Sequence, residues 1–174
     1  MTSSKYSSTA IAFHWTHALI VLFMVIWGAW MADLPKGPER GEAFALHKSV
    51  GILAFMLLLA RLTWRMFHTP PPSIIESKPL RMLSKTIHGL LYLFLLIVPL
   101  AGYTSASFTK YDMKFFGIPF PKFGWEDAGL NEFFSQTHAV LAWSFVALIA
   151  LHILGAIFHS QSLKRMWFFQ TDKG

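Results

Sequence analysis

The sequence predicts an all-α integral membrane protein, a bundle of four transmembrane helices. More than half of its 174 residues are apolar (54%), and they gather in long blocks. Each block reaches the roughly 20 residues that cross a hydrocarbon core of ~30 Å. The blocks cover about residues 11–32, 46–67, 86–108 and 133–160. Short connections leave no room for a separate soluble domain, so we expect one domain over residues 1–174.

The first two spans have distinct ends. No charge lies between Lys5 and Asp33 in the first span. This segment is too long for the apolar core of a signal peptide, and no small-residue cleavage motif follows it, so we expect a retained helix. The second span is followed by Pro70–Pro72, which cannot continue a helix and favours extended backbone.

The last two spans are joined by the longest connection. The third span lies between Lys85 and Lys110, and the fourth begins after Glu132. The connection holds five large aromatic residues among glycines and prolines: Phe115, Phe116, Phe120, Phe123 and Trp125. Such a loop is expected to lie on the membrane interface or to cap the bundle. Anchoring at the interface and docking of a partner both remain open for it.

The chain has a net charge of +6, and the distribution of this charge predicts the topology in the membrane. Basic residues gather around the second connection and outside the first and last spans, whereas the other two connections are nearly balanced. The positive-inside rule then places both termini and the second connection in the cytoplasm. The chain is expected to be a multi-pass membrane protein, in contact with lipid and not with nucleic acid.

The absence of cysteine limits the chemistry. It excludes disulfides, iron–sulfur clusters and covalent haem attachment through thioethers. Any metal must therefore be bound by nitrogen or oxygen ligands.

Histidines inside the spans carry the chemistry, because ionisable residues in a membrane are costly and usually functional. His138 and His152 are fourteen residues apart in the fourth span. At ~100° and ~1.5 Å per residue they share one helix face and lie ~21 Å apart along the axis. One helix therefore offers a ligand at each of two depths, which suits two haems stacked across the membrane.

Each haem needs a second axial ligand from another helix. His14 begins the first span on the inner side and matches His152 in depth, while His47 begins the second span on the outer side and matches His138. Two-histidine ligation leaves no open iron position and suits electron transfer. Two b-type haems held by these four histidines are therefore predicted.

These residues also allow other interpretations. A single intramembrane histidine can be a satisfied polar group that joins helices, but four that pair by depth and face are harder to explain in this way. A zinc site would gather its ligands at one depth with carboxylates, and no acid lies inside any span. Gly28 and Gly51 would give a flat ring space beside the helices, although small residues also simply pack membrane helices closely.

Three more residues are candidates for contacts to a quinone or to haem propionates. Arg61 and Arg65 share one face at the inner end of the second span, and His88 begins the third span on the same side. Anchoring of the arginines to lipid phosphate is an equally good interpretation, and His88 could be an ordinary interfacial residue.

Ordered motifs over almost the whole chain resemble the bacterial cytochrome b561 family. The first two spans carry Phe13-His14-Trp15, then His47-Lys48-Ser49-Val50-Gly51, then Arg61-Leu62-x-x-Arg65 followed by Thr69-Pro70-Pro71. The last two carry His88-x-x-x-Tyr92, Pro99 and Gly102, then Thr137-His138-Ala139, His152 and His159.

The resemblance implies a location in the bacterial inner membrane and haem ligands at His14, His47, His138 and His152. It also implies an oxidoreductase that is similar to a superoxide oxidase, taking electrons from superoxide outside and delivering them to ubiquinone. By the same resemblance the quinone binds near the inner end of the fourth span, which implicates His159 as the catalytic residue. An electron-transfer subunit that links the quinone pool to another periplasmic or membrane redox protein is the alternative.

Overall fold

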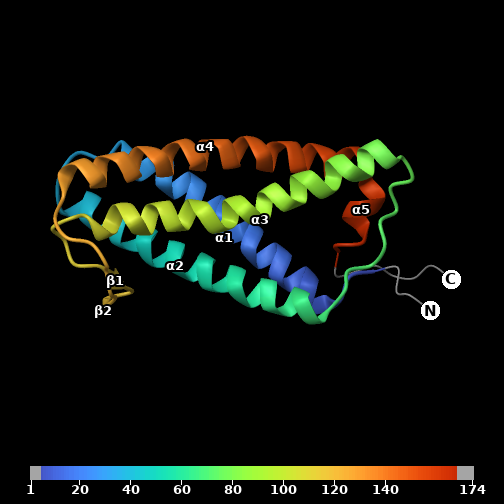
Figure 1. Ribbon diagram of the computed structural model, residues 1–174, viewed down its shortest axis with the longest axis horizontal. Helices are drawn as coiled ribbons and strands as arrows, with labels where there is room; N and C mark the ends of the chain where they lie inside the picture. The colour runs from blue at the N-terminus through green and yellow to red at the C-terminus, as the bar shows by residue number, and fades with distance from the viewer. Residues whose placement is uncertain (1–4, 168–174) are drawn as a thin grey trace.

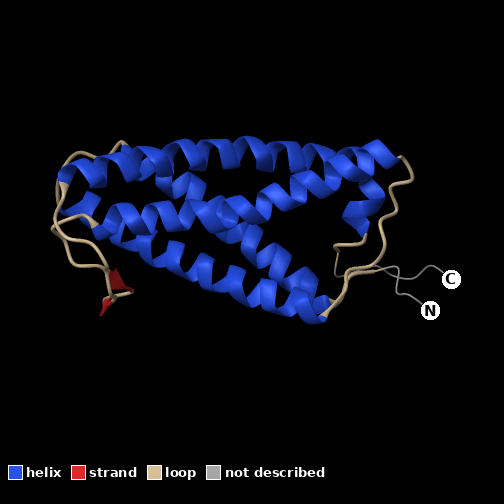
Figure 2. Cartoon of the chain, in the orientation of Figure 1, coloured by secondary structure: helices blue, strands red, loops and turns tan. Residues whose placement is uncertain are grey.

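The computed structural model describes residues 5–167 and consists of four long helices, one short helix and a small hairpin. The long helices are α1 (Ser8–Ala32), α2 (Pro38–Phe67), α3 (Lys78–Ser107) and α4 (Ala128–Phe158). Between α3 and α4 lie β1 (Lys114–Phe115) and β2 (Ile118–Pro119), and α5 (Ser160–Lys164) follows α4. All four long helices are long and apolar enough to cross a membrane, which confirms the predicted helical bundle (Figure 2).

The helices run lengthwise along the molecule in an up-and-down order (Figure 1). Helix α1 packs on α2, α3 packs on α4, and the two pairs meet where α2 contacts α3. The start of α1, the α2–α3 connection and α5 lie at one end, and the β hairpin lies at the other. Few side chains are buried, and many leucines and phenylalanines are exposed, as expected where lipid covers the helices.

The helix ends follow from local sequence. Ser7 caps α1 by accepting a hydrogen bond from the Ala10 N–H, and Asp127 caps α4 by accepting one from the Leu130 N–H. These side chains satisfy backbone donors that a helix start leaves free. Pro38 occupies the first turn of α2, where its missing N–H costs nothing. The helices α2, α3 and α4 also begin five or more residues before the apolar spans that the sequence predicts within them.

The connection between α3 and α4 holds a hairpin that the sequence did not predict. Phe116 and Gly117 both have positive φ (47° and 87°), as a two-residue hairpin turn requires. The buried Ser49 holds the hairpin against α2, because its Oγ accepts a hydrogen bond from the Phe116 N–H at 3.0 Å. The hairpin is thereby tied down two residues after His47.

Candidate functional site

The bundle brings the predicted histidines together in two pairs. The imidazoles of His47 on α2 and His138 on α4 have ring centroids 6.1 Å apart. Those of His14 on α1 and His152 on α4 are 6.2 Å apart. Both pairings are those predicted from depth. Since α4 is continuous from Ala128 to Phe158, its two histidines lie ~21 Å apart along its axis.

These separations fit two axial ligands of one iron. Two imidazoles bound to opposite sides of a metal through bonds of ~2 Å have ring centroids ~6 Å apart. Within residues 5–167 no group of three or more His, Asp or Glu side chains could hold a metal ion. Two imidazoles complete a six-coordinate site when a porphyrin supplies the other nitrogens, so the residues present fit haem better than a bare ion.

We call His47 and His138 the outer pair and His14 and His152 the inner pair, after the sides of the membrane on which the sequence predicts them. His138 Nδ1 lies 2.9 Å from the Val98 carbonyl of α3, next to the helix-interior Pro99. With Nδ1–H donating there, the proton is fixed on Nδ1 and the Nε2 lone pair is left for a metal, which is the usual arrangement of a ligating histidine. Nδ1 of His47 is buried without a hydrogen-bond partner.

Two glycines make room for these outer rings. A Cβ atom on Gly28 of α1 would lie 3.1 Å from Cε1 of His47. A Cβ atom on Gly102 of α3 would lie 3.0 Å from Nδ1 of His138. Both distances are tighter than ordinary carbon contacts, so each imidazole occupies space that only glycine leaves. Gly51 instead faces Met24. Of Gly28 and Gly51, the two glycines considered in the sequence analysis, only Gly28 therefore borders a histidine.

The inner pair has a third imidazole beside it. The ring centroid of His88 on α3 lies 5.1 Å from that of His152, closer than two ligands on opposite sides of a metal. His88 Nδ1 is 2.6 Å from the Ser84 carbonyl, which holds the ring in place. His88 is therefore suited to support His152 and is not suited to replace His14.

Arg61 belongs to the same inner region. Gly28 faces His47, and Gly51 faces Met24, so the antiparallel α1 and α2 are in a register that sets Arg61 opposite His14. The Arg61 charge accordingly acts on His14, His17 and His152. A guanidinium at this place can pair with a carboxylate such as a haem propionate.

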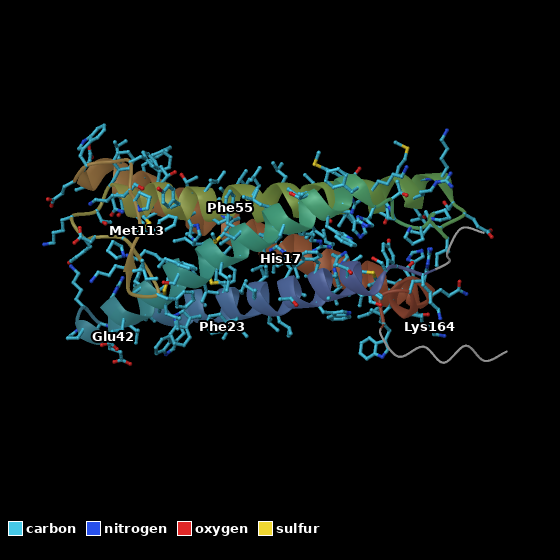
Figure 3. All side chains as sticks on the ribbon, turned by 90° about the horizontal axis from the view of Figure 1, so that it is seen from below. His17, Phe23, Glu42, Phe55, Met113 and Lys164 are labelled. Atoms are coloured by element: carbon cyan, nitrogen blue, oxygen red, sulfur yellow. The ribbon has the colours of Figure 1, made fainter. Side chains whose placement is uncertain are left out.

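His17, one turn after His14 on α1, is deeply buried. It is 2% exposed, and neither ring nitrogen has a hydrogen-bond partner. Figure 3 labels it between the two ends of the bundle, which are marked by Met113 and Lys164. Its position one turn after His14 was visible in the sequence, but its burial depends on how α1 packs.

His159 is the residue at which α4 ends. The helix ends at Phe158, and the backbone turns at His159 (φ −112°, ψ 59°) before α5 begins. The His159 ring is half-buried, with Nδ1 3.2 Å from the Gly155 carbonyl. The fourth span was expected to reach about residue 160, whereas the helix ends at Phe158. His159 lies at the same end of the bundle as the inner pair.

Comparisons with known proteins show what the chain is similar to. The profile of the family described as prokaryotic cytochrome b561 matches residues 5–169. Cytochrome b561 homolog 2 of Escherichia coli (strain K12) is 34% identical, over 95% of this chain and 92% of its own length. The probable superoxide oxidase CybB of Yersinia pestis is 26% identical over 92% and 91%. Cytochrome b562 of Cereibacter sphaeroides is 27% identical over 91% and 89%.

Proposed function

Because the chain belongs to the prokaryotic cytochrome b561 family, a family of membrane electron-transfer proteins, we propose that it oxidises superoxide at the periplasmic face and reduces ubiquinone at the cytoplasmic face. The family implies haem b, and we propose two haems per chain. The observation that carries the proposal is the pair of two-histidine sites at different depths, with ring centroids 6.1 and 6.2 Å apart.

The histidines would hold the haems in a fixed order. His47 and His138 would bind the outer haem, and His14 and His152 would bind the inner one. Haem b supplies a one-electron carrier when it is bound. The residues keep each ring in place: the Val98 carbonyl orients His138, while His88 supports His152 and Arg61 would pair with an inner propionate.

The overall reaction balances with two superoxide anions for each quinone. Each superoxide loses one electron and leaves as dioxygen, and the quinone takes up the two electrons with two protons to become the quinol. On the outer side, the charges of Lys48, next to His47, and Lys122 of the outer loop act on each other. With Lys110 and Lys114 they would attract an anion toward the outer pair. The acidic residues of the same loop weaken this attraction.

On the inner side, we assign the quinone to His159. An imidazole near water can hydrogen-bond a quinone carbonyl and relay a proton. His159 lies outside α4, at the break before α5, where the membrane-spanning helix meets the cytoplasm in the proposed topology. Arg65 and His88 are the next candidates for quinone contacts.

The second candidate function is an electron-transfer subunit that links quinone to another redox protein. The observation in its favour is the outer loop, where Tyr111, Phe123 and Trp125 are strongly exposed. Aromatic side chains of this kind serve either membrane-interface anchoring or partner docking.

One experiment separates the two functions. The purified protein is mixed with superoxide in a stopped-flow spectrometer, with and without ubiquinone, and the absorbance of reduced haem is followed. The proposed oxidase is reduced rapidly by superoxide and is reoxidised when quinone is present. A protein that superoxide leaves oxidised, but that quinol reduces, would be the electron-transfer subunit.

A further inference from the structure

A cavity of about 570 Å³ opens at the end of the bundle that holds α5 and the α2–α3 connection. Its walls come from the segment before α1, the last turns of α2, the proline run after α2, and Tyr92 of α3. None of the four predicted haem ligands lines it, and neither does His159. Its volume lies within the range of ~300–1,000 Å³ that is usual for small-molecule sites.

The polar part of the cavity is cationic. Arg61 and Arg65 both line it, and no acidic side chain does. The two guanidinium carbons lie 5.2 and 5.3 Å from the centroid of the Tyr92 ring, and Arg65 Nη1 donates a hydrogen bond to the Tyr92 hydroxyl at 3.1 Å. Two like charges gathered on one ring repel each other, and an anion between them would offset that repulsion.

The remainder of the cavity wall is apolar and aromatic. Trp64 stacks on His68 with ring centroids 3.6 Å apart and planes 8° from parallel, and both rings line the cavity with Phe13 and Pro71. The Trp64 indole N–H is buried without a hydrogen-bond partner. The cavity thus offers two guanidinium groups at one place and a flat aromatic wall beside them.

From these contacts we propose that the cavity binds the phosphate group of an anionic phospholipid, with the start of an acyl chain along Trp64 and Phe13. Arginine pairs of this kind bind phosphate oxygens through several N–H groups at once. Basic pockets between transmembrane helices on the cytoplasmic side are known to take anionic lipid headgroups. The proposal assigns Arg61 and Arg65 to lipid phosphate in place of the propionate and quinone contacts considered for them above. It does not depend on whether the chain oxidises superoxide.

The test measures which lipid the protein keeps. The haem-loaded protein is reconstituted in bilayers of equal amounts of phosphatidylglycerol and phosphatidylcholine with matched acyl chains. It is then extracted in mild detergent, and the retained phospholipid is quantified by mass spectrometry. We expect about five-fold enrichment of phosphatidylglycerol, and a return toward the bilayer ratio in Arg65→Gln. The matched control Lys85→Gln, which removes an exposed cation of α3 outside the cavity, keeps the enrichment.

Other occupants of the cavity give different results. Unchanged enrichment in Arg65→Gln overturns the proposal, and so does displacement of the lipid by inorganic phosphate, which would assign the site to a free anion. Loss of one haem spectrum in Arg65→Gln would assign the guanidinium to a propionate, and copurified ubiquinone that this variant loses would assign the cavity to quinone. If Arg65→Gln does not fold, Tyr92→Phe, which removes the hydroxyl that holds Arg65, should also lower the enrichment.

Discussion

Replacement of Gly102 by alanine tests whether His138 is fixed as a ligand. The new Cβ atom would lie 3.0 Å from Nδ1 and 3.1 Å from Cε1 of His138, so the ring must shift by a few tenths of an ångström. The ring cannot shift freely, because its Nδ1 is bound to the Val98 carbonyl at 2.9 Å. Overpacking of this kind costs about 1–3 kcal/mol, which lowers the affinity for the outer haem about 5- to 150-fold.

The assay is the haem content of the purified variant by pyridine haemochrome, together with a redox titration of the remaining haem. Gly102→Ala is expected to lose part or all of one haem and to keep the other with its potential unchanged. Gly89→Ala in the same helix is the matched control, because nothing lies within 4 Å of its Cβ position. This control should keep both haems and be slightly more stable, since alanine favours a helix by about 1 kcal/mol over glycine.

Two results would refute this reasoning. If Gly102→Ala bound two haems with unaltered potentials, the His138 ring would not need the position that the structure gives it. If Gly89→Ala lost haem as well, the effect would come from the helix and not from the contact.

The remaining predictions concern the haem pairs, the quinone and the hairpin. The wild-type protein should bind two haems per chain, and a haemochrome ratio of one or none would be incompatible with the two pairs. Alanine variants of the four histidines should give only two types of spectrum: one shared by the His47 and His138 variants and one shared by the His14 and His152 variants. Any other grouping would show that the pairing is wrong. His159→Ala should keep both haems and their reduction from outside while losing most reoxidation by ubiquinone; unchanged quinone kinetics would place the quinone elsewhere. Ser49→Ala removes the hydroxyl that accepts from the Phe116 N–H, costs about 1 kcal/mol, and should speed proteolysis within the hairpin, whereas equal cleavage rates would mean that Ser49 does not hold it.

Hydropathy was sufficient to predict the four helices, because a membrane span must be apolar over its whole length. The pairing of His47 with His138, and of His14 with His152, was also predictable. The rise per residue of a helix gives the depth of each histidine in the membrane, and the up-and-down order of the helices shows which histidines lie at the same depth.

Side-chain neighbours that depend on the rotation of one helix against another were not predictable. The hydrogen bond from the Phe116 N–H to Ser49 Oγ joins residues 67 positions apart, and no sequence feature near Ser49 predicts it. The turn at His159 was missed because its neighbours, Phe158 and Ser160, carry no helix-breaking signal of the kind that proline gives after α2. The burial of His17 was missed for the same reason as the Ser49 bond, since it follows from the packing of α1 and not from its own periodicity.

The two histidine pairs share α4 but are built for different surroundings. At the outer pair, glycines on α1 and α3 leave space for the rings and a backbone carbonyl fixes one of them, so the protein constrains both ligands by shape. At the inner pair, a third imidazole, that of His88, stands beside His152, and the guanidinium of Arg61 lies nearby. A cation near a carrier favours its reduced state, because reduction adds negative charge. Cations lie near both pairs, with Lys48 next to His47 and Arg61 near His14. Charge alone therefore does not set a direction of electron transfer, and the two pairs differ in how the protein holds their rings.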